Sequence, residues 1–130
     1  MIKKITINGR YINDITSFYA EVNRVFMQTE NWKIGESLDA FNDLLYGGFG
    51  AISGNEQVEL VWTDATISRD ALGYDVTRAY YISKLQPGSP FNKKHFNNKL
   101  KELELGNGQT YFDILVEIIS GRSNITLILC

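Results

Sequence analysis

Three short strand-like segments, separated by long stretches of helical pattern, restrict the folds open to this chain. Residues 3–7 and 58–62 place large apolar side chains at every second position, and residues 124–129 are nearly all apolar. Strands separated by helices pair in parallel, because each helix crosses over a face of the sheet. We therefore expect an α/β fold with a three-stranded parallel sheet packed by helices. The apolar last segment is typical of a strand buried on both faces, so we expect it to be the central strand.

The segments between these strands carry apolar residues at helical intervals and end at breaks rich in glycine or proline. The expected helices cover residues 18–27, 38–46, 66–72, 74–85, 92–103 and 111–120. Asp14 or Thr16 can cap the first helix and Ser37 the second, because short side-chain oxygens accept hydrogen bonds from a first helical turn. With 130 residues, no internal repeat and no linker, the chain is expected to form one domain, residues 1–130.

The second of these helices combines a core-facing stripe with an acidic face. Leu38, Phe41 and Leu45 share one side of it, whereas Asp39 and Asp43 stand four residues apart on another. Two exposed carboxylates at this spacing repel each other by roughly 0.2–0.5 kcal/mol. Between residues 34 and 61 every charged side chain is acidic. This helix is either an ordinary solvated face or a surface that keeps its negative charge for a partner.

Composition argues against several classes of function. A net charge of −2 at pH 7 lacks the strong basic excess of a general nucleic-acid or membrane-surface protein. No apolar run approaches the roughly 18 residues that span a bilayer, and the first residues do not resemble a signal peptide. Cys130 is the only cysteine, which excludes an internal disulfide and suits a reducing compartment. We expect a cytoplasmic protein.

The sequence offers little for catalysis or for metal binding. His95, the single histidine, stands in a lysine-rich helix with no neighbour in sequence to orient its ring. Neither a cysteine–histidine spacing nor a carboxylate-rich loop predicts a metal site. The glycine cluster at residues 47–50 ends a helix, whereas phosphate-binding loops begin one. We expect no catalytic residues, no metal and no cofactor; a general acid–base pair of Asp39 and Asp43 is the least favoured alternative.

The basic segment at residues 93–101 is a second candidate surface. Phe91 and Phe96 are interleaved with its lysines and could stack on nucleic-acid bases. They could equally form the buried stripe of the helix, and the acidic end of that helix offsets much of its field. The solvated-face interpretation is favoured, so no direct nucleic-acid contact is expected.

Three motifs, in this order, resemble the barstar family: KKITING at the start, IGESLDAFNDLL in the middle and NITLILC at the end. Barstar is an intracellular inhibitor of a secreted ribonuclease, and its family has a three-stranded parallel sheet packed by helices. Residues 63–108 are longer than in the short archetype. Their LGYDVTRAYYISKL and the later FDILVEIIS resemble an extended branch with additional helix between the second and third strands.

The resemblance implies which residues contact the partner. Asp43 corresponds to the aspartate that enters the ribonuclease phosphate site, and Asp39 to the one that faces the catalytic rim. Glu117 corresponds to an acidic residue that makes a peripheral ion pair. Two positions depart from the family, since Lys33 and Asn42 stand where it has aromatic residues; Trp32 is a spatial substitute for the first. The remaining expected contacts are Gly35, Ser37, Leu38, Tyr46 and Gly47.

The expected function is therefore that of a barstar-like protein inhibitor, which binds and blocks the active site of a small basic ribonuclease or ribonuclease toxin domain with its acidic helix. Such a protein would act as an immunity protein, as a monomer, without membrane contact. The alternative is a non-catalytic regulatory or scaffold protein of the same fold, whose partner is not a nuclease.

Overall fold

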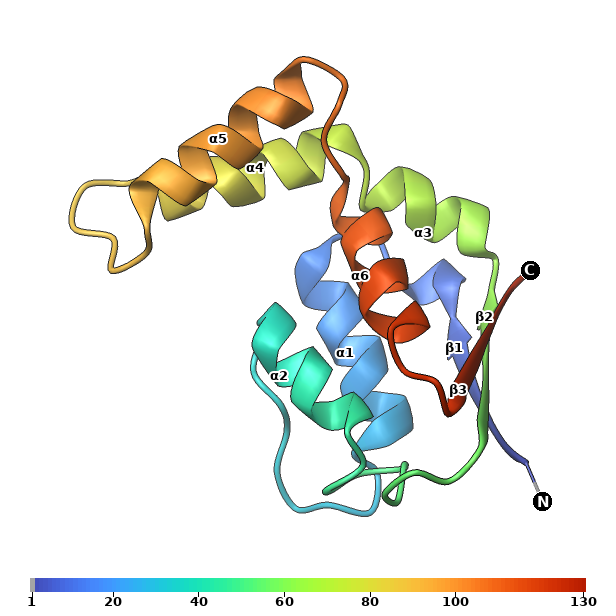
Figure 1. Ribbon diagram of the computed structural model, residues 1–130. Helices are drawn as coiled ribbons and strands as arrows, with labels where there is room; N and C mark the ends of the chain where they lie inside the picture. The colour runs from blue at the N-terminus through green and yellow to red at the C-terminus, as the bar shows by residue number, and fades with distance from the viewer. Residues whose placement is uncertain (1) are drawn as a thin grey trace.

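The computed structural model describes residues 2–130 and has the α/β architecture that the sequence predicts. A parallel sheet is formed by β1 (Lys3–Asn8), β2 (Val58–Thr63) and β3 (Ile125–Leu129), in the order β1-β2-β3 (Figure 1). Ile5 pairs with Leu60, which in turn pairs with Leu127. The connection from β1 to β2 carries two α-helices and the connection from β2 to β3 carries four, so the expected additional helix is present.

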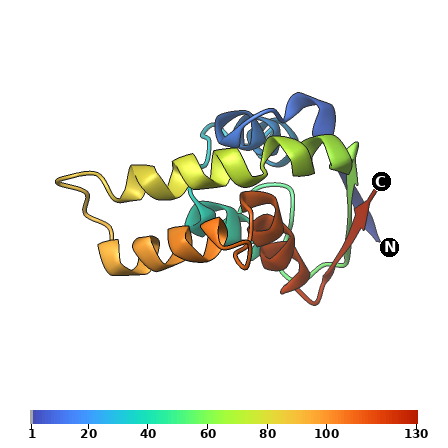
Figure 2. The same ribbon diagram turned by 90° about the horizontal axis from the view of Figure 1, so that it is seen from above.

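The prediction that the last strand is central was wrong. β2 lies between its two neighbours, and β3 forms an edge of the sheet. Figure 2 shows why: the helices gather on one side of the sheet and leave the other side open. On the open face Thr6, Val61 and Ile128 lie in register, and Ile128 is 37% exposed. An apolar strand at the edge of a half-covered sheet has the same sequence pattern as a buried central strand.

Two helices pack the covered face of the sheet around an aromatic core. α1 (Ile15–Phe26) is capped by Asp14, one of the two residues expected to cap it, whose side chain forms a capping box with Ser17. α6 (Tyr111–Ser120) begins at Thr110 in the same way. The ring of Phe18 stacks on Trp62 at a centroid distance of 5.8 Å, and the centre of the Phe112 ring lies 5.1 Å from that of Trp62.

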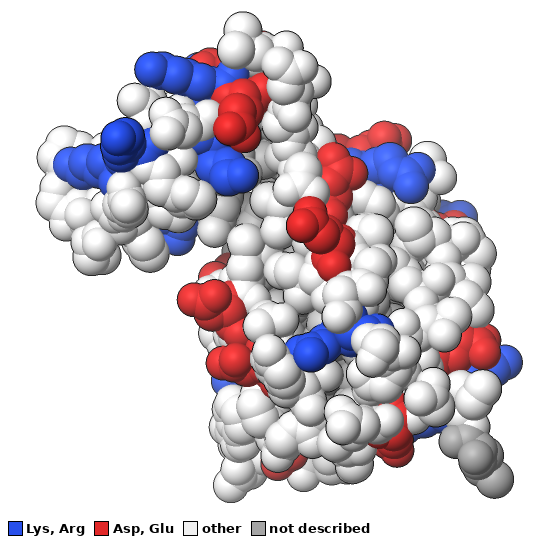
Figure 3. Space-filling view, viewed as in Figure 1, with Lys and Arg blue, Asp and Glu red and all other residues white. Residues whose placement is uncertain are grey.

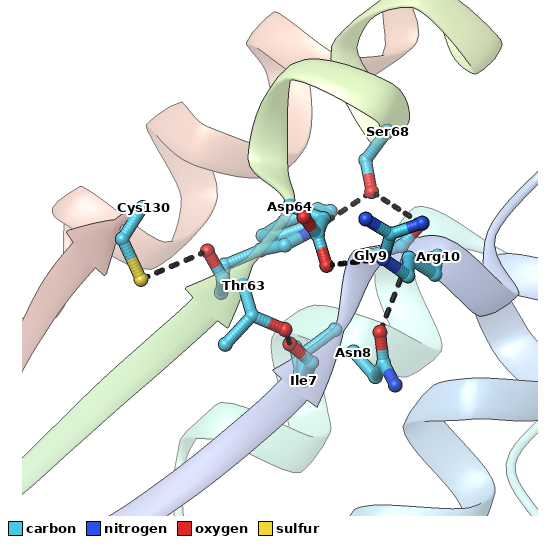
Figure 4. Close-up of polar contacts among 9 residues, drawn as sticks. Ile7, Asn8, Gly9, Arg10, Thr63, Asp64, Ser68 and Cys130 are labelled. Atoms are coloured by element: carbon cyan, nitrogen blue, oxygen red, sulfur yellow. Dashed lines mark hydrogen bonds and ion pairs between the residues drawn. The ribbon is translucent and has the colours of Figure 1, made fainter.

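The carboxyl ends of β1 and β2 are joined to α3 (Ala65–Ala71) by a polar cluster (Figure 4). A 3₁₀ turn, η1 (Gly9–Tyr11), follows β1, and Arg10 donates to the carboxylate of Asp64 at 3.0 Å. The buried Ser68 hydroxyl accepts from the Trp62 indole N–H at 2.9 Å and donates to the Gly9 carbonyl at 3.2 Å. Because the buried Trp62 and Ser68 groups satisfy one another, the cluster ties the ends of β1 and β2 to α3.

A helical hairpin extends away from this body (Figure 1). It consists of α4 (Tyr74–Lys84) and α5 (Lys93–Glu104), joined by the expected proline-rich turn. At its base, the Thr77 hydroxyl accepts from the Tyr111 backbone N–H at 2.7 Å. Within residues 2–130 no helix combines the length and the apolar character needed to cross a lipid bilayer.

Candidate functional site

The acidic helix α2 (Leu38–Leu45) is firmly fixed to the body. Its expected cap is confirmed, because the Ser37 hydroxyl accepts from the Ala40 backbone N–H at 3.1 Å. Phe41, Leu44 and Leu45 are buried in the core. Any side chain on the outer face of α2 is therefore presented from a rigid support.

That outer face carries two carboxylates without a cationic partner. Asp39 and Asp43 are both exposed, and within residues 2–130 neither has a Lys, Arg or His nitrogen within 4.0 Å. Acidic side chains over α2 are visible below the hairpin in Figure 3. Asp39 stands in the first turn of the helix, where the positive end of the helix dipole favours a negative charge. Asp43 is too far along the helix to benefit from this effect.

A cleft of about 670 Å³ opens between α2, α6 and the α4–α5 hairpin. Its hollow is visible between the hairpin and the body in Figure 3. The structure brings six of the predicted contact residues together in its lining: Ser37, Leu38, Asp39, Asn42, Tyr46 and Glu117. These residues come from α2, its two ends and α6, so one partner could contact all of them at once.

The other four predicted contact residues do not line the cleft. Asp43 lies outside it, and Lys33 borders a separate hollow beside Trp32. Gly35 is exposed, and nothing lies within 4 Å of where its Cβ would be. Gly47 has a structural reason to be glycine: its φ is +86°, and a Cβ there would lie 2.4 Å from the Gly54 carbonyl oxygen.

The two positions at which the resemblance fails differ in their surroundings. Asn42 is half-buried at the cleft. Lys33 is exposed, and the neighbouring Trp32 packs against Phe49 at a centroid distance of 4.9 Å. Trp32 thus stays partly accessible next to Lys33, at 46% exposure, and its role as a substitute aromatic contact remains a prediction.

Cationic side chains also line the cleft, and the sequence did not predict their position there. Lys84 and Lys99 reach it from the hairpin, and the Arg122 guanidinium lies 3.9 Å from the centre of the Tyr46 ring. The solvated-face interpretation of residues 93–101 suits the exposed Lys93, Lys94, His95 and Lys101, whereas Lys99 is half-buried at the cleft. Two helices of similar length joined by a short proline-containing loop are compatible with a hairpin. Which of its sides faces the body depends on contacts between distant residues.

Two tyrosines of α4, Tyr80 and Tyr81, line the cleft. Burial raises the pKa of Tyr80, and the nearby Asp39 carboxylate raises it further. Burial also raises the pKa of Tyr81, with smaller contributions from Tyr80 and Glu102. Both phenols are therefore protonated at neutral pH and can donate hydrogen bonds to a partner.

The cleft contains the single histidine of the chain, His95. The His95 ring packs edge-on against Phe96 at 5.0 Å, and within residues 2–130 no side chain forms a hydrogen bond to it. In the same part of the chain no three His, Cys, Asp or Glu side chains gather to hold a metal ion. What the cleft offers is unpaired charge, aromatic surface and hydroxyl groups.

Comparison with known proteins assigns no family to this arrangement. No protein-family model matches the chain, and a search of curated proteins finds no significant relative. The functional interpretation therefore depends on the chemistry of the surface itself and on the motif resemblance.

Proposed function

We propose that this protein is a barstar-like inhibitor that binds a small basic ribonuclease, or a ribonuclease toxin domain, through α2. One observation carries the proposal: Asp39 and Asp43 are exposed and unpaired within residues 2–130, on a helix whose opposite face is buried. The three-stranded parallel sheet with helices between its strands agrees with the fold that the resemblance implies.

The physical basis of such inhibition is charge mimicry. Ribonucleases hold the substrate phosphate with cationic side chains, and a fixed carboxylate can occupy the same position. Opposite patches raise the association rate by electrostatic steering, and charge pairs that lose their water contribute to affinity. The repulsion between Asp39 and Asp43 falls when a cationic site covers them, which favours the complex over the free helix.

The decisive experiment measures inhibition of a panel of small basic microbial ribonucleases by the wild type and by Asp43→Ala. We expect at least one enzyme to be inhibited, and the variant to bind it about 30-fold or more weakly, about 2 kcal/mol, as interface hot spots do. Asp70→Ala removes one exposed carboxylate from α3, away from the cleft, and serves as the matched control. Equal affinity of the wild type and Asp43→Ala would refute the role of α2.

The basic residues of the cleft favour a second candidate, a regulatory or scaffold protein whose partner is not a nuclease. A basic enzyme that approaches Asp39 must also come close to Lys84, Lys99 and Arg122. Salt separates the two functions: association with a basic ribonuclease slows steeply as ionic strength rises, whereas a mainly apolar scaffold contact does not. A salt-independent association rate with a partner captured from the source cell would favour the scaffold.

A further inference from the structure

The two walls of the cleft differ in charge. Lys84 and Lys99 stand on the hairpin wall, whereas Asp39 and Glu117 stand on the wall formed by α2 and α6, together with Arg122, which follows α6. In Figure 3 most charged side chains over the hairpin are basic, with acidic ones at its near end, and the body below carries acidic side chains together with a few basic ones. An occupant of the cleft therefore meets a mainly cationic surface on the hairpin side and a mixed surface, with two carboxylates and Arg122, on the other.

These charges do not neutralise one another across the cleft. The Lys84 ammonium lies 4.0 Å from the centre of the Phe91 ring and 5.0 Å from that of Tyr80, and Lys99 pairs with Glu102 on its own helix at 3.9 Å. Within residues 2–130, no ion pair joins the hairpin to α2 or α6. Among the described residues, Lys84 has no carboxylate partner and Lys99 has only the exposed Glu102, and the half-buried setting of the two lysines strengthens their attraction for an anion.

Both walls of the cleft also carry apolar and aromatic side chains. Tyr80 and Tyr81 line the cleft from α4, and Ile114 and Ile118 line it from α6. A ligand that fills the cleft must bring apolar groups as well as a negative charge. Peptide segments have this composition, because acidic and apolar side chains can alternate along an extended chain.

We propose that the hairpin wall is a second binding surface, which accepts an extended acidic segment of a partner protein with its carboxylates at Lys84 and Lys99. This inference goes beyond the ribonuclease proposal, since it concerns an acidic ligand and does not require Asp43. A nucleic acid fits less well, because it carries a phosphate at every nucleotide and some of these would face Asp39 and Glu117. A peptide can place uncharged residues there.

The test uses the full chain and a short synthetic peptide of glutamate, leucine and glycine, titrated at low ionic strength. Lys84→Gln combined with Lys99→Gln removes two charges from the cleft wall. Lys93→Gln combined with Lys101→Gln removes two from the exposed surface of α5 and is the matched control. We expect the cleft pair to weaken peptide binding about tenfold and the control pair to change it less than about twofold.

Three results would overturn the inference. The first is no saturable binding of the peptide by the wild type. The second is equal weakening by the two double variants, which would indicate diffuse electrostatic attraction. A single-stranded RNA oligonucleotide that binds more tightly than the peptide, through Lys84 and Lys99, would identify nucleic acid as the occupant. Because Asp43→Ala is expected to bind the peptide as the wild type does, failure of ribonuclease inhibition leaves this test intact.

Discussion

At the scale of single residues, Ser68 holds the central aromatic side chain in place. It is fully buried, and its hydroxyl is the hydrogen-bond acceptor for the buried Trp62 indole N–H. Ser68→Ala leaves that N–H without a partner in the core, so we expect the free energy of unfolding to fall by about 1–3 kcal/mol in denaturant titration. Ser83→Ala removes an exposed hydroxyl and should change it by less than about 0.5 kcal/mol. Equal effects would show that Ser68 does not support Trp62.

Local side-chain chemistry explains which single residues could be predicted from the sequence. The caps Asp14 and Ser37 follow from short oxygen-bearing side chains placed just before an apolar period. The backbone conformation of Asp64 could not be predicted, since its φ of 50° is left-handed although it is not glycine. Arg10, which pairs with it, is distant in sequence and comes near only after β1 and β2 have paired.

At the scale of an element, the end of α2 depends on Gly47. This residue has a left-handed φ and lies against the backbone of Gly54, whose N–H donates to the Gly47 carbonyl at 2.8 Å. Gly47→Ala adds a backbone penalty of about 1–2 kcal/mol and a steric clash, so we expect thermal unfolding to shift to lower temperature. Gly48→Ala is the control, because a Cβ there meets nothing within 4 Å and φ is not positive. A control variant as unstable as Gly47→Ala would contradict this explanation.

The helices and strands could be predicted from the sequence more fully than their positions in the fold. Periodicity located the helices and strands, because the side-chain repeat of each type depends only on local geometry. It misplaced the last strand, since the apolar run of β3 is compatible both with a central position and with the edge of a sheet covered on one face. The side of the hairpin that faces α2 is fixed by contacts such as Thr77 with Tyr111 and is invisible to local patterns.

At the scale of the whole molecule, the acidic face of the candidate surface could be predicted from the sequence, whereas the hairpin wall opposite it could not. The acidic face of α2 follows from the spacing of Asp39 and Asp43 within one helix. The opposing wall requires the α4–α5 hairpin to stand across the cleft from α2, so that Lys84 and Lys99 share a cleft with a helix about 40 to 60 residues earlier in the chain. The net charge of −2 conceals this arrangement, since it sums all charged residues of the chain.

The pH dependence of global stability tests how the molecule buries its tyrosines. The hydroxyls of Tyr19 and Tyr111 share a buried hydrogen bond of 2.7 Å, and burial raises both pKa values above the ordinary value of about 10. Stability should be fully present below pH 10 and fall above it, since only the unfolded chain then loses these protons. Each tyrosine contributes a slope of about 1.4 kcal/mol per pH unit. Tyr19→Phe combined with Tyr111→Phe removes both hydroxyls and should flatten the alkaline decline measured by denaturant titration; an unchanged slope would contradict this origin.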